Sequence, residues 1–158
     1  MSLWIERYHP LLIAVISVLA LVYLRPNISL LFKEGVWSAE GLYSAIFGWS
    51  SIQSGFAFGV YGFVIGRDEG FVKAIKDTVA FERFISYTRR ASYAGFFLAI
   101  ISIPLIVSAP DLSSTKGSVY FLVSAWFGVF VWTFISFLRL AFNFGKIASV
   151  KDRPFHGA

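Results

Sequence analysis

The chain has no cysteine among its 158 residues, and only 15% of those residues are charged. Without cysteine there is no disulfide framework, no thiol nucleophile and no cysteine-ligated zinc or iron–sulfur centre. Soluble domains are typically about 25% charged. The low charge, together with 57% hydrophobic residues and a mean hydropathy of +0.70, therefore excludes a soluble globular protein and a disordered chain. The composition indicates a helical membrane protein with several spans.

Motifs that carry chemistry are also missing. The sequence contains no HExxH, GxSxG, Walker A or dinucleotide-binding pattern. No ionisable residue lies in the middle of an apolar segment, which disfavours proton-coupled transport. The two histidines, His9 and His156, lie near the chain ends, which disfavours a haem held by two histidines. We therefore expect a protein that is not an enzyme, with no catalytic residue, cofactor, metal site or nucleic-acid partner.

Four apolar segments stand out along the chain, at about residues 8–24, 41–66, 91–107 and 119–139. A spanning helix needs about 20 mostly apolar residues, with a range of about 17–25. Because unpaired backbone groups are costly in lipid, apolar runs of this length form helices. The sequence predicts an all-α, polytopic integral membrane protein, with residues 1–158 as a single domain of four transmembrane helices.

Lysine and arginine are distributed unevenly between the predicted sides of the membrane. The side that holds the N-terminus, the 67–90 segment, Arg139 at the end of the fourth segment and the 140–158 tail has 11 of them, and the opposite side has 3. Basic residues are enriched in cytoplasmic loops, which also accounts for the net charge of +5. We expect the bacterial inner (plasma) membrane, with both termini inside and residues 25–40 as a short external link.

The 67–90 segment is predicted to be a cytoplasmic helical hairpin between the second and third spans, or a helix on the membrane surface. Five of its basic residues could contact anionic lipid or a cytoplasmic partner: Lys73, Lys76, Arg83, Arg89 and Arg90. The plainer interpretation is a solvated, charged hairpin.

A seam of small residues is the sharpest pattern in the second span. Its members recur at spacings of 3 and 4 and fall within an arc of roughly 80° on a helix; they are Ser44, Gly48, Ser51, Gly55, Gly59, Gly62 and Gly66. Such a seam lets two helix backbones approach closely. The third span has a similar face, formed by Ala91, Gly95, Ala99 and Ser102. Either the two seams pack together inside one subunit, or the second-span seam joins copies of the chain.

A separate polar stripe lies on the same span. Ser50, Gln53, Ser54 and Tyr61 fall within roughly 100° of one another, away from the seam. Gln53 is the most polar side chain in the middle of any span. The stripe is either a hydrogen-bonding contact between helices, worth about 0.6 kcal/mol on average, or the lining of an aqueous path.

Three functions are compatible with this architecture. The first is a small, self-associating pore or channel-like homo-oligomer in the lipid bilayer, which would serve ion transport. The second is a non-catalytic subunit of a larger membrane complex, docking its partner through the 67–90 segment and through the aromatic faces of the fourth span. The third, a lipid-modifying enzyme, lacks any paired acid, histidine cluster or nucleophile–base pair in a span.

Overall fold

The computed structural model describes residues 3–66, 70–113 and 117–149, and within these ranges every regular element is a helix. The elements are α1 (Leu3–Tyr23), α2 (Arg25–Lys33), α3 (Ala39–Gly66), α4 (Gly70–Ile75), α5 (Val79–Ser108) and α6 (Gly117–Ala148). The predicted all-α class is confirmed.

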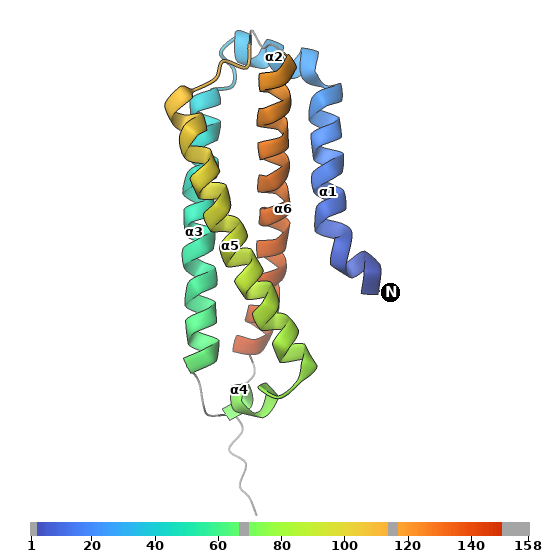
Figure 1. The fold of residues 1–158 in the computed structure, drawn as a ribbon, viewed down its shortest axis with the longest axis vertical. Coiled ribbons are helices and arrows are strands. Elements are labelled where there is room, and N and C mark those ends of the chain that lie inside the picture. Colours follow the sequence, from blue (N-terminus) through green and yellow to red (C-terminus); the bar gives the residue numbers. More distant parts are fainter. Residues whose placement is uncertain (1–2, 67–69, 114–116, 150–158) are drawn as a thin grey trace, which may run out of the picture.

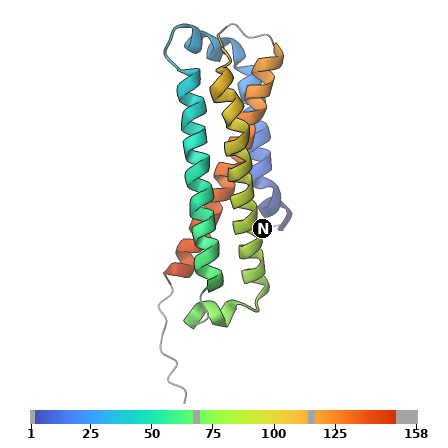
Figure 2. The same ribbon diagram turned by 60° about the vertical axis from the view of Figure 1, so that its left-hand side comes forward.

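Four long helices form an up-and-down bundle, in which successive long helices run in opposite directions (Figure 1). Helix α3 packs mainly against α5, and α6 contacts α1, α3 and α5. Helix α2 lies across one end of the bundle, while α4 lies at the other end, to which the final residues of α6 also point (Figure 2). The arrangement leaves α1 at the edge, packed on α6.

Two helices, α5 and α6, are long and apolar enough to cross a membrane. The pair formed by residues 8–23 of α1 and by α2 passes the same criterion only when taken together, and it is bent by 69°. Helix α3 is not in this set, because the glycines, serines and Gln53 of its middle lower its hydropathy. The four predicted spans are thus supported in part, by two helices.

The link expected at residues 25–40 is largely helical. Helix α2 begins directly after α1 and carries Pro26 in its first turn, where a missing N–H costs no helical hydrogen bond. The sequence predicted a short link here without assigning its secondary structure, and Arg25-Pro26 changes the direction of the chain without preventing a new helix. The ring of Trp37 then packs edge-on against Phe32 of α2, with centroids 5.8 Å apart.

The 67–90 segment, expected as a helical hairpin between the second and third spans, contains the short helix α4, a turn and the first turns of α5. Thr78 is the N-cap of α5, and its side chain accepts a hydrogen bond of 3.3 Å from the backbone N–H of Phe81. Helix α5 continues past Pro104 and ends at Ser108, where Ala109 adopts a left-handed conformation with φ of 38°. Residues 67–69 lie outside the described residues.

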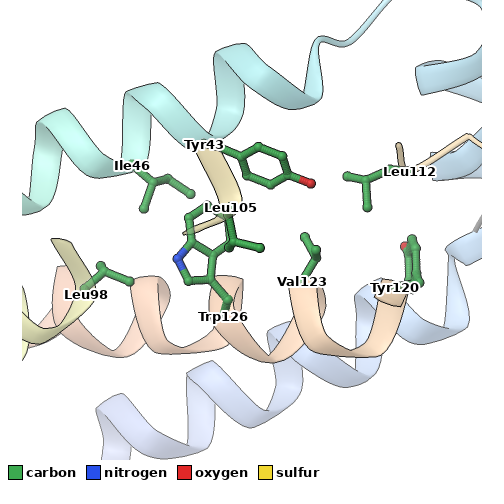
Figure 3. Close-up of a cluster of buried hydrophobic side chains, with 8 residues drawn as sticks. All are labelled: Tyr43, Ile46, Leu98, Leu105, Leu112, Tyr120, Val123 and Trp126. Atoms are coloured by element: carbon green, nitrogen blue, oxygen red, sulfur yellow. The ribbon is translucent and has the colours of Figure 1, made fainter. Parts of the chain in front are cut away.

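One buried cluster joins α3, α5 and α6 near the α2 end of the bundle (Figure 3). At its centre, the rings of Tyr43 and Trp126 pack edge-to-face with centroids 5.5 Å apart. The indole Nε1 of Trp126 donates a hydrogen bond of 3.0 Å to the Ser102 hydroxyl, and the Tyr43 hydroxyl donates one of 3.1 Å to the Pro110 carbonyl. The polar ends of both aromatic side chains are therefore satisfied inside the bundle.

A ladder of aromatic rings joins α3 to α6 on another face. Trp49, Phe56 and Phe63 of α3 alternate with Phe134, Phe137 and Phe144 of α6, with centroid distances from 5.2 to 6.0 Å. Edge-on pairs of this kind are worth about 0.5–1.5 kcal/mol each beyond the burial of their surface. They fix the register between the two helices.

The buried face of α5 can be tested with a matched pair of truncations. Leu98 is fully buried and Ile100, two residues further on, is 49% exposed. We expect Leu98→Ala to lower the free energy of unfolding by about 2–5 kcal/mol, because it leaves a cavity, and Ile100→Ala to lower it by much less. Reversible unfolding in mixed micelles measures both, and equal losses would contradict the orientation of α5.

Candidate functional site

The small-residue seam of α3 faces outward. A Cβ atom added at Gly48, Gly55, Gly59, Gly62 or Gly66 would meet no side chain of the described residues within 4 Å. Gly48 is half-buried, and Ser44 and Ser51 are exposed like the other four glycines. The seam therefore does not pack against the seam of α5, and the intramolecular alternative is wrong.

The polar stripe of α3 occupies the place expected for the seam. Ser50 and Gln53 are fully buried and Ser54 is 7% exposed. The side-chain amide of Gln53 donates a hydrogen bond of 3.3 Å to the Ala91 carbonyl, and the Ser54 hydroxyl donates one of 3.4 Å to the Ser92 carbonyl. The stripe is thus a contact between α3 and α5, with Tyr61 half-buried at its end.

The small residues of α5 make this contact possible. Ala91 is 2% exposed, Gly95 and Ser102 are buried, and Ala99 is half-buried. A Cβ at Gly95 would lie 2.7 Å from the Ser54 hydroxyl oxygen and 3.2 Å from the Ser50 carbonyl oxygen. The hydroxyl would have to move, and the backbone oxygen would have to give by a few tenths of an ångström, so glycine at position 95 is what lets the two backbones approach this closely.

Two polar atoms at this contact remain without a hydrogen-bond partner among the described residues, Gln53 Oε1 and Ser92 Oγ. A buried polar atom without a partner usually costs about 1–3 kcal/mol. Close packing and two long hydrogen bonds therefore hold the contact together, while these two atoms accept or donate no hydrogen bond within the described residues. It binds α3 to α5 and leaves Gln53 no exposed surface.

The basic residues predicted to contact lipid or a partner lie on three different elements. Lys73 is exposed on α4, and the half-buried Lys76 donates a hydrogen bond of 3.2 Å to the Ile65 carbonyl at the end of α3. The three arginines of this set, Arg83, Arg89 and Arg90, are exposed on α5. Through its hydrogen bond, Lys76 acts as a cap for α3.

The structure also contains features that the sequence patterns missed. A pocket of about 580 Å³ opens beside α2, and its lining, which includes Ile28, Phe32, Trp37 and Phe127, is almost entirely apolar. A second pocket of about 100 Å³ lies between α1, α5 and α6 and brings Arg139 close to Arg90. No sequence signal marks either pocket, since each combines residues from helices far apart in the chain.

No protein-family model matches this chain, and no curated protein or solved structure is significantly similar to it. Within the described residues, no group of three or more histidine, aspartate or glutamate side chains could hold a metal ion. The arguments for function therefore come from the geometry of the chain itself.

The closest approach between α3 and α5 can be tested by filling it. We expect Gly95→Leu to destabilise the bundle by about 2 kcal/mol or more, because the new side chain overlaps with the serines of α3. Gly145→Leu is the control, because it adds the same side chain to α6 at a position outside the seam where nothing lies within 4 Å. Unfolding in mixed micelles measures both, and a stable Gly95→Leu variant would refute the contact.

The polar stripe can be tested at Gln53. We expect Gln53→Leu to change the free energy of unfolding by less than about 1 kcal/mol, because the lost hydrogen bond is weak and the unpaired Oε1 atom is lost with it. Gln53→Ala is the matched control and should cost about 2 kcal/mol or more, since it leaves a cavity. A large loss in the leucine variant would show that the amide itself holds the helices together.

Proposed function

We propose that the chain is an integral membrane protein that forms homo-oligomers through the outward seam of α3. The observation that supports this most directly is the open space at Gly55, Gly59, Gly62 and Gly66, on the side of α3 that faces away from α5. Between helices in lipid, where there is no hydrophobic driving force, small residues allow the close packing that holds them together. A second copy of the chain offers the same seam and completes the contact.

The mutual packing of the four long helices supports placing all of them in the membrane. Helix α3 has 28 residues, which at 1.5 Å per residue is about 42 Å and exceeds a hydrocarbon core of about 30 Å. It lies beside α5 and α6, and its most polar side chains face α5 rather than lipid. We infer four spans, with the N-terminus, α4 and the end of α6 on the cytoplasmic side of a bacterial inner membrane, because most lysines and arginines are there.

In this oligomer, the ion path of a channel-like function would lie at the oligomer axis. Gln53 is fully buried inside the protomer, so it does not line such a path. Seam packing would place α3 next to the axis, with the exposed Ser44 and Ser51 facing it. Our proposal therefore places the ion path at the oligomer axis, beside the packed α3 seam, and leaves the polar stripe a packing role.

A subunit of a larger membrane complex is the second candidate. The outer face of α1 supports it: Leu11, Leu12, Ile16 and Leu19 are 49–63% exposed, and the helix packs on α6 at the bundle edge. The aromatic face of α6 supports it less, because Trp126 is buried and Phe134 contacts the Trp49 ring of α3. Phe127 and Phe130 are half-buried, which leaves Trp132 as the exposed ring of this set.

Self-association can be tested by enlarging the seam. We expect Gly59→Leu to raise the dissociation constant of the homo-oligomer roughly tenfold or more, about 1.4 kcal/mol, because the side chain separates the facing backbones. The fold should remain intact, since nothing within 4 Å opposes a side chain there. Analytical ultracentrifugation in neutral detergent or single-molecule photobleaching in bilayers measures the oligomeric state.

Ala125→Leu is the matched control, because Ala125 is also exposed but lies on α6. It should leave the oligomer unchanged. A wild-type protein that is monomeric, or one that copurifies in fixed ratio with a foreign membrane protein, would refute self-association in favour of the subunit role.

A further inference from the structure

The larger pocket, beside α2, is a cavity lined without charge. Residues of α1, α2, the start of α3 and α6 surround a volume of about 580 Å³, and ligand pockets commonly measure about 300–1,000 Å³. Three of the lining side chains, Leu112, Tyr120 and Val123, belong to the buried cluster around Trp126 (Figure 3). Among the described residues that line the pocket, none is acidic, basic or histidine. The pocket therefore suits an apolar group and disfavours an ionised one.

One hydroxyl group in the lining has no partner within the described residues. The Tyr120 hydroxyl donates a hydrogen bond of 2.8 Å to the Leu21 carbonyl. The Ser38 hydroxyl accepts one of 3.1 Å from the backbone N–H of Gly41. Ser124 is only 3% exposed, and its hydroxyl forms no hydrogen bond in the part of the chain that the structure describes.

The isolation of Ser124 contrasts with other serines of the long helices. The hydroxyls of Ser102 and Ser136 donate to the carbonyl four residues earlier, at 2.7 and 2.8 Å, which satisfies a serine within its own helix. Ser124 makes no such bond, so its O–H group can donate to an acceptor in the pocket. Because a buried hydroxyl without a partner is unfavourable, such an acceptor would stabilise the protein with its ligand bound.

The height of Ser124 on α6 matches the level of lipid ester groups. Helix α6 has 32 residues, which is about 48 Å at 1.5 Å per residue. Centred on a hydrocarbon core of about 30 Å, it leaves about 9 Å outside the core at each end. Ser124 lies seven residues after Gly117, the first residue of α6, which is about 10 Å along the helix. The acyl chains of a bilayer lipid join their ester carbonyls at this boundary of the core.

We propose that the pocket beside α2 holds an acyl chain of a bilayer lipid, with an ester carbonyl of that lipid accepting a hydrogen bond from Ser124. The apolar lining receives the chain, and the carbonyl supplies an uncharged acceptor for the buried hydroxyl. Since no described lining residue is charged, recognition depends on the ester and not on the charge of the headgroup. The proposal rests on the membrane placement argued above and is independent of self-association.

Two lipids that differ only in their linkage test the role of the carbonyl. The full-length protein is purified in neutral detergent and titrated with dioleoyl phosphatidylcholine or with its ether-linked analogue, which has the same headgroup and chain length but no carbonyl. Native mass spectrometry counts the bound lipid. We expect the ester lipid to bind about fivefold more tightly, as one hydrogen bond provides. Equal affinity for the two lipids would overturn the proposal.

A matched pair of serine variants assigns this preference to the pocket. Ser124→Ala removes the unpartnered hydroxyl, so we expect the preference for the ester lipid to disappear while the affinity for the ether lipid stays unchanged. Ser136→Ala is the control, because that hydroxyl also lies on α6 but is bonded within its helix and does not line this pocket. It should keep the preference. Loss of the preference in both variants, or in neither, would refute the role of Ser124. The preference is a ratio measured within one variant, so a general loss of stability does not imitate the result.

Other ligands give different results. Dioleoyl phosphatidylglycerol should bind as tightly as dioleoyl phosphatidylcholine, within about twofold. A strong preference for phosphatidylglycerol would assign lipid binding to basic residues outside the pocket and overturn the proposal. A lipophilic molecule without an ester that copurifies with the wild-type protein in fixed ratio, and that acyl lipid does not displace, would assign the pocket to that molecule instead.

Alkaline carbonate extraction separates failure of the pocket from failure of the membrane placement. Release of the chain from membranes would refute the placement and the lipid site together. A chain that stays in the membrane and binds ester and ether lipids equally would refute the lipid site alone.

Discussion

The close contact between α3 and α5 is the constraint on which the rest of the bundle depends. At Gly95 the α5 backbone comes so near to Ser50 and Ser54 that a single added carbon would lie 2.7 Å from a hydroxyl oxygen. Because the most polar face of α3 is used in this contact, the glycine face on the opposite side is left outward. The packing of α3 against α5 therefore decides both the orientation of α3 and which of its faces is exposed.

The other contacts of the bundle are mainly aromatic. Rings from α3 and α6 alternate along the ladder. On another face, Trp126 of α6 packs on Tyr43 of α3 and donates its hydrogen bond to Ser102 of α5. Large rings need wide spaces between helices, whereas the α3–α5 contact needs a narrow one. Helix α3 satisfies both by presenting serine and glutamine to α5 and aromatic rings to α6.

Several buried polar groups donate hydrogen bonds to the backbone of a neighbouring element. The stripe of α3 is covered by the α5 backbone, and the Tyr43 and Tyr120 hydroxyls donate to the carbonyls of Pro110 and Leu21. Large apolar side chains remain exposed on α1, α3, α5 and α6. Such a surface suits an apolar surrounding, either lipid or the helices of another copy.

The sequence alone determined the helical class, because long apolar runs with few charges leave the backbone no other way to satisfy its hydrogen bonds. It also determined which residues share a face of α3, since a period of 3.6 residues places the seam and the stripe apart. Only the tertiary structure decided which face meets α5, because either a glycine seam or a serine and glutamine stripe can pack on small residues. The meeting of Arg90 with Arg139 at one pocket was likewise beyond the sequence, since it depends on how distant helices pack beside one another.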